Sequence, residues 1–181
     1  RSASISFVAK QRAAISKYFE AKGVNIPLFN GGGTGSLSYA KDETHLTELT
    51  TGSGLLCPHL FDYYSNLDLE PATFFALQTV RKPDSDWWTC QGGGYIASGE
   101  PGWDRSPIPY WPQDLKLNSN EGCGEVQTPI QSKRHINLGS GVIFRHAKAG
   151  ELAERFNDYL LVDGDKKNFV KTYRGHGQCF F

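Results

Sequence analysis

The N-terminal part of the chain carries two successive apolar patterns. Apolar residues recur at roughly helical spacing between Ile5 and Phe19, and Gly23 follows as a C-terminal cap, which predicts a helix over residues 5–22. The next segment, residues 24–29, is a largely apolar run that contains one polar residue, Asn25. A run without alternation is typical of a parallel strand that is buried on both faces. The pattern therefore predicts a helix followed at once by a buried strand.

From about residue 71 the pattern changes to short apolar segments separated by Pro, Gly, Asn and Asp clusters. Such punctuation is typical of antiparallel strands joined by turns. The spacing predicts strands over residues 73–80, 87–90, 94–97, 125–129, 142–145, 159–162 and 168–173. Residues 147–157 have the propensity of a short helix, and periodicity alone does not settle that segment. We expect an antiparallel β domain over residues 69–181, preceded by an α/β unit over residues 1–68.

Composition narrows the possible functions. The chain has 181 residues, with 19 basic and 19 acidic side chains, so it shows no electrostatic footprint for nucleic acid or an anionic membrane. No apolar run approaches the ~20 residues of a membrane span, and the N-terminus lacks the apolar core of a signal peptide. We expect a cytoplasmic protein with no nucleic-acid or membrane partner.

Cysteine and methionine usage adds two expectations. The four cysteines, Cys57, Cys90, Cys123 and Cys179, include no C-x-x-C pair, which argues against a disulfide scaffold and a structural zinc site. We expect reduced, small apolar side chains. The sequence contains no methionine, even at position 1. We therefore expect a fragment of a longer protein.

The glycine-rich stretch at residues 30–36 is the main candidate for binding chemistry. It follows the predicted strand 24–29, and its glycines allow successive backbone N–H groups to point at one anion, with the hydroxyls of Thr34 and Ser36 as further donors. The stretch matches neither the P-loop nor the G-x-G-x-x-G pattern, which favours a phosphate that is held rather than transferred. The alternative is a flexible glycine turn without a ligand.

A second loop supports the same interpretation. Residues 51–54, with the sequence Thr-Gly-Ser-Gly, follow a second brief strand predicted over residues 46–49. Ligands in α/β folds lie at the carboxyl ends of parallel strands, and two successive units that end in this way are typical of the last part of a TIM-type (β/α)8 barrel. The predicted fold class is therefore α/β plus β, with the last βα units of such a barrel followed by the β domain.

His146 is the main candidate for proton transfer. It lies at the end of an apolar strand within residues 144–151, together with Arg145, Lys148 and Glu151. The imidazole of His146 is able to serve as acid, base or metal ligand because its reference pKa lies near neutrality. The alternative is a solvated strand end with a surface salt bridge.

Taken together, these residues resemble the C-terminal half of a pyridoxal-phosphate enzyme of the alanine-racemase-like group, in its D-threonine aldolase and D-serine dehydratase branch (amino acid deaminase/aldolase). The resemblance depends on the order of several short motifs along nearly the whole chain: residues 31–36, 51–54, 61–64, 92–94, 104–105, 107–109 and 138–146. By this resemblance, Gly32, Gly33, Thr34, Gly35 and Ser36 would hold the cofactor phosphate. The β domain would cover a barrel mouth, usually that of a partner subunit, which implies a homodimer.

The resemblance also implies two departures from the family. The family's Schiff-base lysine belongs near the first barrel strand, and nothing that matches this strand precedes Arg1. We therefore expect a missing N-terminal barrel half that carries this lysine and without which the chain is an incomplete catalyst. The family places a metal on a His-x-Asp or His-x-Cys pair, whereas this chain has His146 and Lys148. Since an ammonium repels a metal ion, we expect no metal there and a role for Lys148 as the positive group.

These expectations lead to one preferred function and two alternatives. The first is the C-terminal part of a pyridoxal-phosphate-dependent lyase, aldolase, deaminase or racemase acting on small D-amino or 3-hydroxy amino acids, with His146 and Lys148 as catalytic residues. The second is a non-catalytic module that retains the glycine cup for phosphate or a cofactor. The third is a β-rich interaction domain in which the glycine loops are structural.

Overall fold

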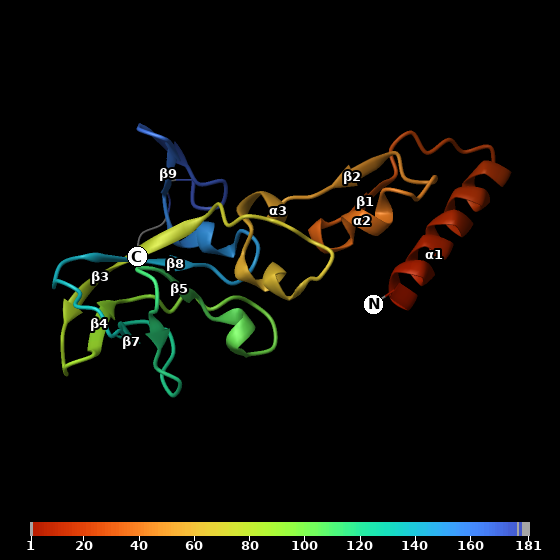
Figure 1. Cartoon of the computed structure of the whole chain (residues 1–181). Coiled ribbons are helices and arrows are strands. Elements are labelled where there is room, and N and C mark those ends of the chain that lie inside the picture. The colour runs from red at the N-terminus through yellow and green to blue at the C-terminus, as the bar shows by residue number, and fades with distance from the viewer. Residues whose placement is uncertain (1, 177, 179–181) are drawn as a thin grey trace.

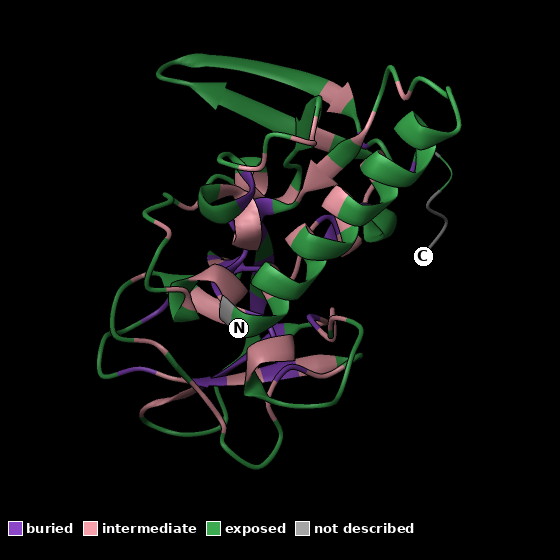
Figure 2. Ribbon diagram, turned by 90° about the vertical axis from the view of Figure 1, so that its right-hand side faces the viewer, coloured by how far each residue is buried: buried purple, intermediate pink, exposed green. Residues whose placement is uncertain are grey.

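The computed structural model describes residues 2–176 and 178. Figure 1 shows α1 at one end of the molecule and the large β-sheet at the other, with short helices and strands between them. Figure 2 shows that the buried residues gather in the sheet, whereas α1 (Ser2–Ala21) and the hairpin of β9 (Asp158–Asp163) and β10 (Lys166–Lys171) are largely exposed. Within the described residues, no helix has the length and apolar character needed to cross a membrane.

The N-terminal helix is confirmed, and the buried strand after it is wrong. Helix α1 covers Ser2–Ala21. Residues 24–29 are not a strand, and Val24 and Leu28 are 47% and 61% exposed. The strand β1 begins later, at Asn30–Gly32, and pairs in parallel with β2, Glu48–Thr50. Its glycines allow this pairing because a Cβ on Gly32 would lie 3.0 Å from the Thr50 carbonyl oxygen.

Short helical turns connect the parallel pair to the β domain. They are the 3-10 helix η1, the helices α2 and α3, and the 3-10 helix η2, which cover Thr34–Ser36, Leu37–Ala40, Ser53–Leu56 and His59–Tyr63. The described chain thus contains one parallel strand pair of the kind expected, and the complete barrel and the division at residues 68 and 69 stay predictions.

The antiparallel β domain is confirmed. Its six strands follow the order β5-β8-β3-β4-β7-β6. They cover Phe74–Arg81 (β3), Trp87–Gln91 (β4), Ile108–Trp111 (β5), Lys116–Leu117 (β6), Gln127–Gln131 (β7) and Gly141–Arg145 (β8). The two edge strands β5 and β6 contact each other, so the sheet curls toward a closed barrel.

The core of this domain follows from alternation along its strands. In β3, Phe75 and Leu77 point inward and their neighbours point outward. Phe75 stacks on Phe144 of β8 with ring centroids 5.4 Å apart, and Trp88 of β4 is buried beside them. A separate hairpin of β9, Asp158–Asp163, and β10, Lys166–Lys171, confirms the last two predicted strands.

Two segments differ from or refine the sequence expectations. Residues 94–97 are not a strand, because the preceding glycines press against neighbouring chain: a Cβ on Gly93 would lie 2.5 Å from Thr128 Oγ1, and one on Gly94 would lie 2.7 Å from the Glu125 nitrogen. Within residues 147–157, the structure contains the 3-10 helix η4 over Glu151–Arg155. The remaining 3-10 helix, η3, covers Trp103–Arg105.

Candidate functional site

The glycine loop is held by backbone pairing and by one buried hydroxyl. The Gly33 N–H donates to the Thr50 carbonyl at 2.7 Å, which continues the pairing of β1 with β2. Thr34 is 6% exposed, and its Oγ1 accepts the Gly54 N–H at 2.9 Å and lies 2.8 Å from Thr51 Oγ1. The two loops predicted to converge, residues 31–36 and 51–54, are therefore joined through Thr34.

These loops line a pocket of about 410 Å³, here called the cup. Its walls contain the predicted residues Gly33, Thr34, Gly35 and Ser36, and in addition Ser4, Ile5, Ser53 and Phe61. The fifth predicted residue, Gly32, lies in β1 and is not part of the wall. The structure thus brings most of the predicted cofactor-binding residues to one hollow surface.

The backbone of the cup suits an anion better than its hydroxyls do. No acceptor among the described residues takes the N–H of Thr34 or Gly35, and both amides belong to the first turn of η1, which has no side-chain cap. Gly33 has a φ of +109°, and a Cβ there would meet only Ser36 Oγ, at 3.8 Å. Ser36 Oγ already donates to the Gly32 carbonyl at 3.0 Å. An anion in the cup would therefore meet backbone donors first.

Part of this wall could not be predicted from the sequence. Ser4 and Ile5 come from the first turn of α1, and Phe61 comes from η2, far along the chain from the glycine loop. Phe61 was identified only within a motif and not as a wall of the cup. The first turn of a long helix carries a partial positive charge, so Ser4 and Ile5 add a further favourable field for an anion.

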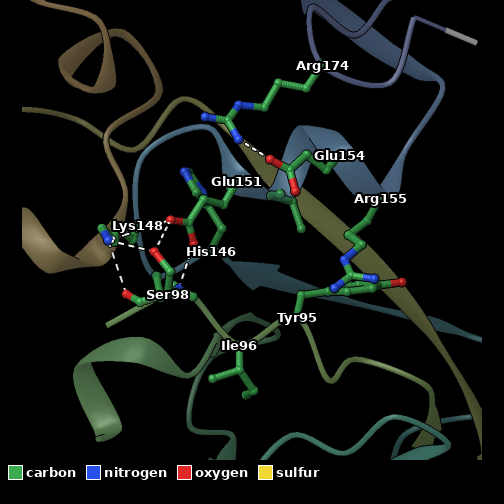
Figure 3. A pocket seen from close by; sticks show the side chains of 12 residues that line it. Tyr95, Ile96, Ser98, His146, Lys148, Glu151, Glu154, Arg155 and Arg174 are labelled. Carbon is green, nitrogen blue, oxygen red and sulfur yellow. Dashed lines mark hydrogen bonds and ion pairs between the residues drawn. The ribbon is translucent and has the colours of Figure 1, made fainter. Parts of the chain in front are cut away.

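His146 and Lys148 line a second pocket, of about 350 Å³, here called the His146 pocket (Figure 3). Its walls come from the segments around residues 95–98, 146–155 and 174. The cup and this pocket share no lining residue among the described residues. The predicted catalytic and cofactor-binding residues therefore form two separate groups in this chain.

The environment of His146 favours a neutral imidazole with one accepting nitrogen. His146 is 2% exposed, and its Nδ1 lies 3.2 Å from the Thr73 carbonyl oxygen, which can only accept. Nδ1 therefore carries the proton, and Nε2 has no partner among the described residues. Burial is the largest influence and lowers the pKa of His146, the backbone of Ala149 and Thr73 raises this pKa, and the charges of Arg145 and His59 lower it further.

Lys148 is bound within a polar network. Its ammonium donates to Ser98 Oγ at 2.8 Å and to the Ser98 carbonyl at 3.1 Å, and it lies 3.6 Å from Glu151 Oε1 (Figure 3). Glu151 also accepts the Ser98 N–H at 2.8 Å. Burial raises the pKa of Glu151, but the hydrogen bonds from Ser98 and the charge of Lys148 outweigh it and lower this pKa overall. The network joins segments 50 residues apart.

The rest of the His146 pocket is rich in charge. Arg174 is paired with Glu154, and Arg155 lies on the same wall beside Tyr95 (Figure 3). The wall thus contains three cationic side chains and two carboxylates, which leaves one positive charge when His146 is neutral. Such a balance favours a small anionic ligand. Sequence reasoning missed Arg174 and Glu154, whose positions become adjacent only in the fold.

The described residues form no cluster of the usual metal-binding side chains. Within residues 2–176 and 178, no group of three or more His, Cys, Asp and Glu side chains is placed to hold a metal ion. Cys57, Cys90 and Cys123 are free and buried, as expected, whereas Cys179 lies outside the described residues. The role of Lys148 as a replacement for a metal stays a prediction.

Comparison with known proteins identifies similar folds but no related sequence. No model of a protein family matches the chain, and no curated protein matches it. The crystal structure of D-threonine aldolase from Filomicrobium marinum is similar with a TM-score of 0.78 and 14% identity, covering 99% of this chain and 48% of that one. D-threo-3-hydroxyaspartate dehydratase from Delftia sp. HT23 is similar with a TM-score of 0.66 and 16% identity, covering 97% and 52%.

These identities show a shared fold. The chain spans about half the length of the solved structures that it matches. Its parallel strand pair and antiparallel β domain therefore have the fold of about half of a D-threonine aldolase chain, which agrees with the resemblance seen in the sequence motifs.

Proposed function

We propose that this chain is the C-terminal part of a pyridoxal-phosphate-dependent enzyme that acts on small D-amino or 3-hydroxy amino acids. The observation that carries this proposal is the cup, in which the N–H groups of Thr34 and Gly35 have no acceptor within residues 2–176 and 178 and line a pocket beside an open glycine turn. This donor set fits a phosphate group. The fold shared with D-threonine aldolase and D-threo-3-hydroxyaspartate dehydratase supports the same reaction class.

Each group of residues has a role in this proposal. Gly33, Thr34, Gly35 and Ser36 bind and orient the phosphate, Gly32 positions this loop through its pairing with β2, and Phe61 excludes water from the phosphate. Bound pyridoxal phosphate supplies an electron sink for charge that develops at the substrate Cα. His146 holds or accepts a proton at Nε2, and Lys148 orients the substrate with its ammonium. The lysine that anchors the cofactor belongs to an N-terminal barrel half, and the enzyme is a homodimer.

A glycine exchange tests the cup. The Gly33→Ala variant adds a Cβ at a φ of +109° in the cup, and Gly139→Ala is a matched control because Gly139 has a φ of +87° and open space around its Cβ. Both variants carry a similar backbone strain, of about 1 kcal/mol. A calorimetric titration with pyridoxal phosphate is expected to show weaker binding of this cofactor only for Gly33→Ala. Equal binding by both variants and the wild type would contradict the proposal.

Activity requires a second experiment on the protein expressed from its complete gene. We expect turnover of a D-3-hydroxy amino acid, with a loss of about 100-fold in kcat for His146→Gln if this side chain moves the proton. If the wild-type protein binds the cofactor but turns over neither D-amino acids nor their 3-hydroxy derivatives, the enzymatic function is contradicted.

One observation favours a second candidate. No lysine is among the described residues that line the cup, and Lys148 lies in the other pocket with its donors directed to Ser98. These features fit a module that binds phosphate or a cofactor without chemistry. Cofactor binding by the complete protein with no turnover would support this module.

A further inference from the structure

The helix η2 contacts both pockets. Its Phe61 lines the cup, and its first two residues bind the backbone of the His146 pocket. The His59 N–H donates to the His146 carbonyl at 3.1 Å, and the Leu60 N–H donates to the Ala147 carbonyl at 3.1 Å. His146 and Ala147 both line the second pocket. A single turn of helix therefore joins two pockets that share no lining residue.

One buried cation fixes this turn on the β domain. Arg145, at the end of β8, is 6% exposed and binds Asp62 of η2 through two parallel hydrogen bonds of 2.8 Å. The same guanidinium donates to the Cys57 carbonyl at 3.2 Å. Because the fork of an arginine matches a carboxylate at two points, it fixes orientation as well as distance. Asp62 directly follows Phe61, so the contact sets the position of the cup wall.

A second buried contact supports the same arrangement. The imidazole Nε2 of His59 lies 2.7 Å from the Ser106 carbonyl, and this histidine is 2% exposed. Thus η2 is bound to the β domain by an ion pair at one end and by backbone and imidazole hydrogen bonds at the other. A displacement of η2 that carries Phe61 with it would strain the hydrogen bonds from His59 and Leu60 to the carbonyls of His146 and Ala147.

We propose that η2 couples the cup to the His146 pocket, and that Arg145 is the positioning residue that makes this coupling rigid. The inference rests on the proposed function only in taking an anion as the ligand of the cup. Arg145 lines neither pocket. It acts through Asp62 and Phe61 on the cup and through the backbone of His59 and Leu60 on the His146 pocket.

The test uses Arg145→Lys, which keeps the charge but loses the two-point contact with Asp62. Arg134→Lys is the matched control, because Arg134 makes a single exposed ion pair with Asp114 at 3.4 Å. Inorganic phosphate is the probe, and its affinity is measured by calorimetry. The ring signals of His146 are followed by NMR during the same titration, and amide exchange is recorded at His59 and Leu60.

In the wild type and in Arg134→Lys, phosphate is expected to shift the ring signals of His146. In Arg145→Lys this shift is expected to disappear, phosphate affinity to fall about fivefold or more, and the His59 and Leu60 amides to exchange about tenfold faster. Amides of the β4–β7 ladder, such as Trp88, should keep their wild-type exchange rates. If Arg145→Lys does not fold, Asp62→Asn replaces one of the two acceptor oxygens by an amide donor and so breaks the two-point contact from its half-exposed side.

The outcomes separate this inference from the proposed function. Phosphate binding to the wild type without a response of His146 overturns the coupling and leaves the cup intact. Absence of phosphate binding to the wild type contradicts the proposed function, and amide exchange then decides the role of Arg145 alone. Unchanged exchange at His59 and Leu60 in Arg145→Lys overturns that role.

Discussion

The hydroxyl of Thr34 is expected to hold the cup together. It is the contact between the two loops, because its Oγ1 accepts the Gly54 N–H at 2.9 Å and lies 2.8 Å from Thr51 Oγ1. The Thr34→Val variant keeps the shape of the side chain and removes both hydrogen bonds. Thr34→Ser keeps the hydroxyl, so it should preserve both contacts.

The expected change in the free energy of local opening follows from these contacts. Each hydrogen bond contributes about 1 kcal/mol net, and Gly54 keeps an unsatisfied N–H in a partly buried position. We therefore expect Thr34→Val to lower the free energy of local opening by about 2 kcal/mol. Since 1.4 kcal/mol corresponds to a factor of ten, the Gly54 amide should exchange about 30-fold faster in the native state.

Native-state hydrogen exchange measures this opening directly, and a phosphate titration measures its consequence. Thr128→Val is the control, because Thr128 is fully buried in β7 and donates to the Gly92 carbonyl at 2.6 Å, away from the cup. This control should lose stability without losing phosphate affinity. Wild-type exchange at Gly54 together with wild-type phosphate affinity in Thr34→Val would refute the reasoning.

Three further predictions concern the β domain. Burial lowers the pKa of His146 below its ordinary value of 6.5, so the unfolded chain binds more protons and the free energy of unfolding should fall as pH drops below about 6.5. Urea titrations at pH 7.5 and 5.5 measure this loss of unfolding free energy. The loss should be smaller in His146→Gln than in the wild type, and unchanged in His135→Gln, at an exposed loop position. Burial raises the pKa of Cys90 and of Cys123 to about 11, so a thiol reagent at pH 8 should label both side chains only after denaturation. Rapid labelling of these cysteines in the native chain would contradict their burial. Phe144→Ala should cost about 3–5 kcal/mol of unfolding free energy in denaturant titrations, because Phe144 is fully buried and stacked on Phe75, and a loss below about 1 kcal/mol would contradict this packing.

The sheet was predictable because local pattern and tertiary packing agree there. Strand β3 alternates between buried and exposed residues, and its apolar face is the face that packs on Phe144. The predicted strand over residues 24–29 failed for the opposite reason. Its apolar residues Val24 and Leu28 are exposed and not covered by the part of the chain that the structure describes, and the strand formed instead at Asn30–Gly32, where glycines allow close pairing with β2.

The candidate site was predictable where chemistry depends on a residue type at one position. Glycines mark the cup because Gly33 needs a φ that other residues rarely adopt, and an imidazole marks the second pocket because few side chains titrate near neutrality. The hydrogen-bond partners of the site residues could not be predicted in the same way. Ser98 binds Lys148 across 50 residues, and nothing in a serine between glycine-rich segments indicates that contact.

The ion pair between Arg145 and Asp62 shows why such partners matter for function. Its members are 83 residues apart, and in the sequence each is an ordinary charged residue beside a motif. In the fold, burial removes the guanidinium from water, so only a well-oriented carboxylate compensates for its charge. That requirement fixes η2 in one orientation and thereby places Phe61 against the cup while His59 and Leu60 hold the His146 pocket. Under the proposed function, the glycines bind the phosphate and the imidazole moves a proton, and the inferred role of the buried pair is to hold the two pockets in one geometry.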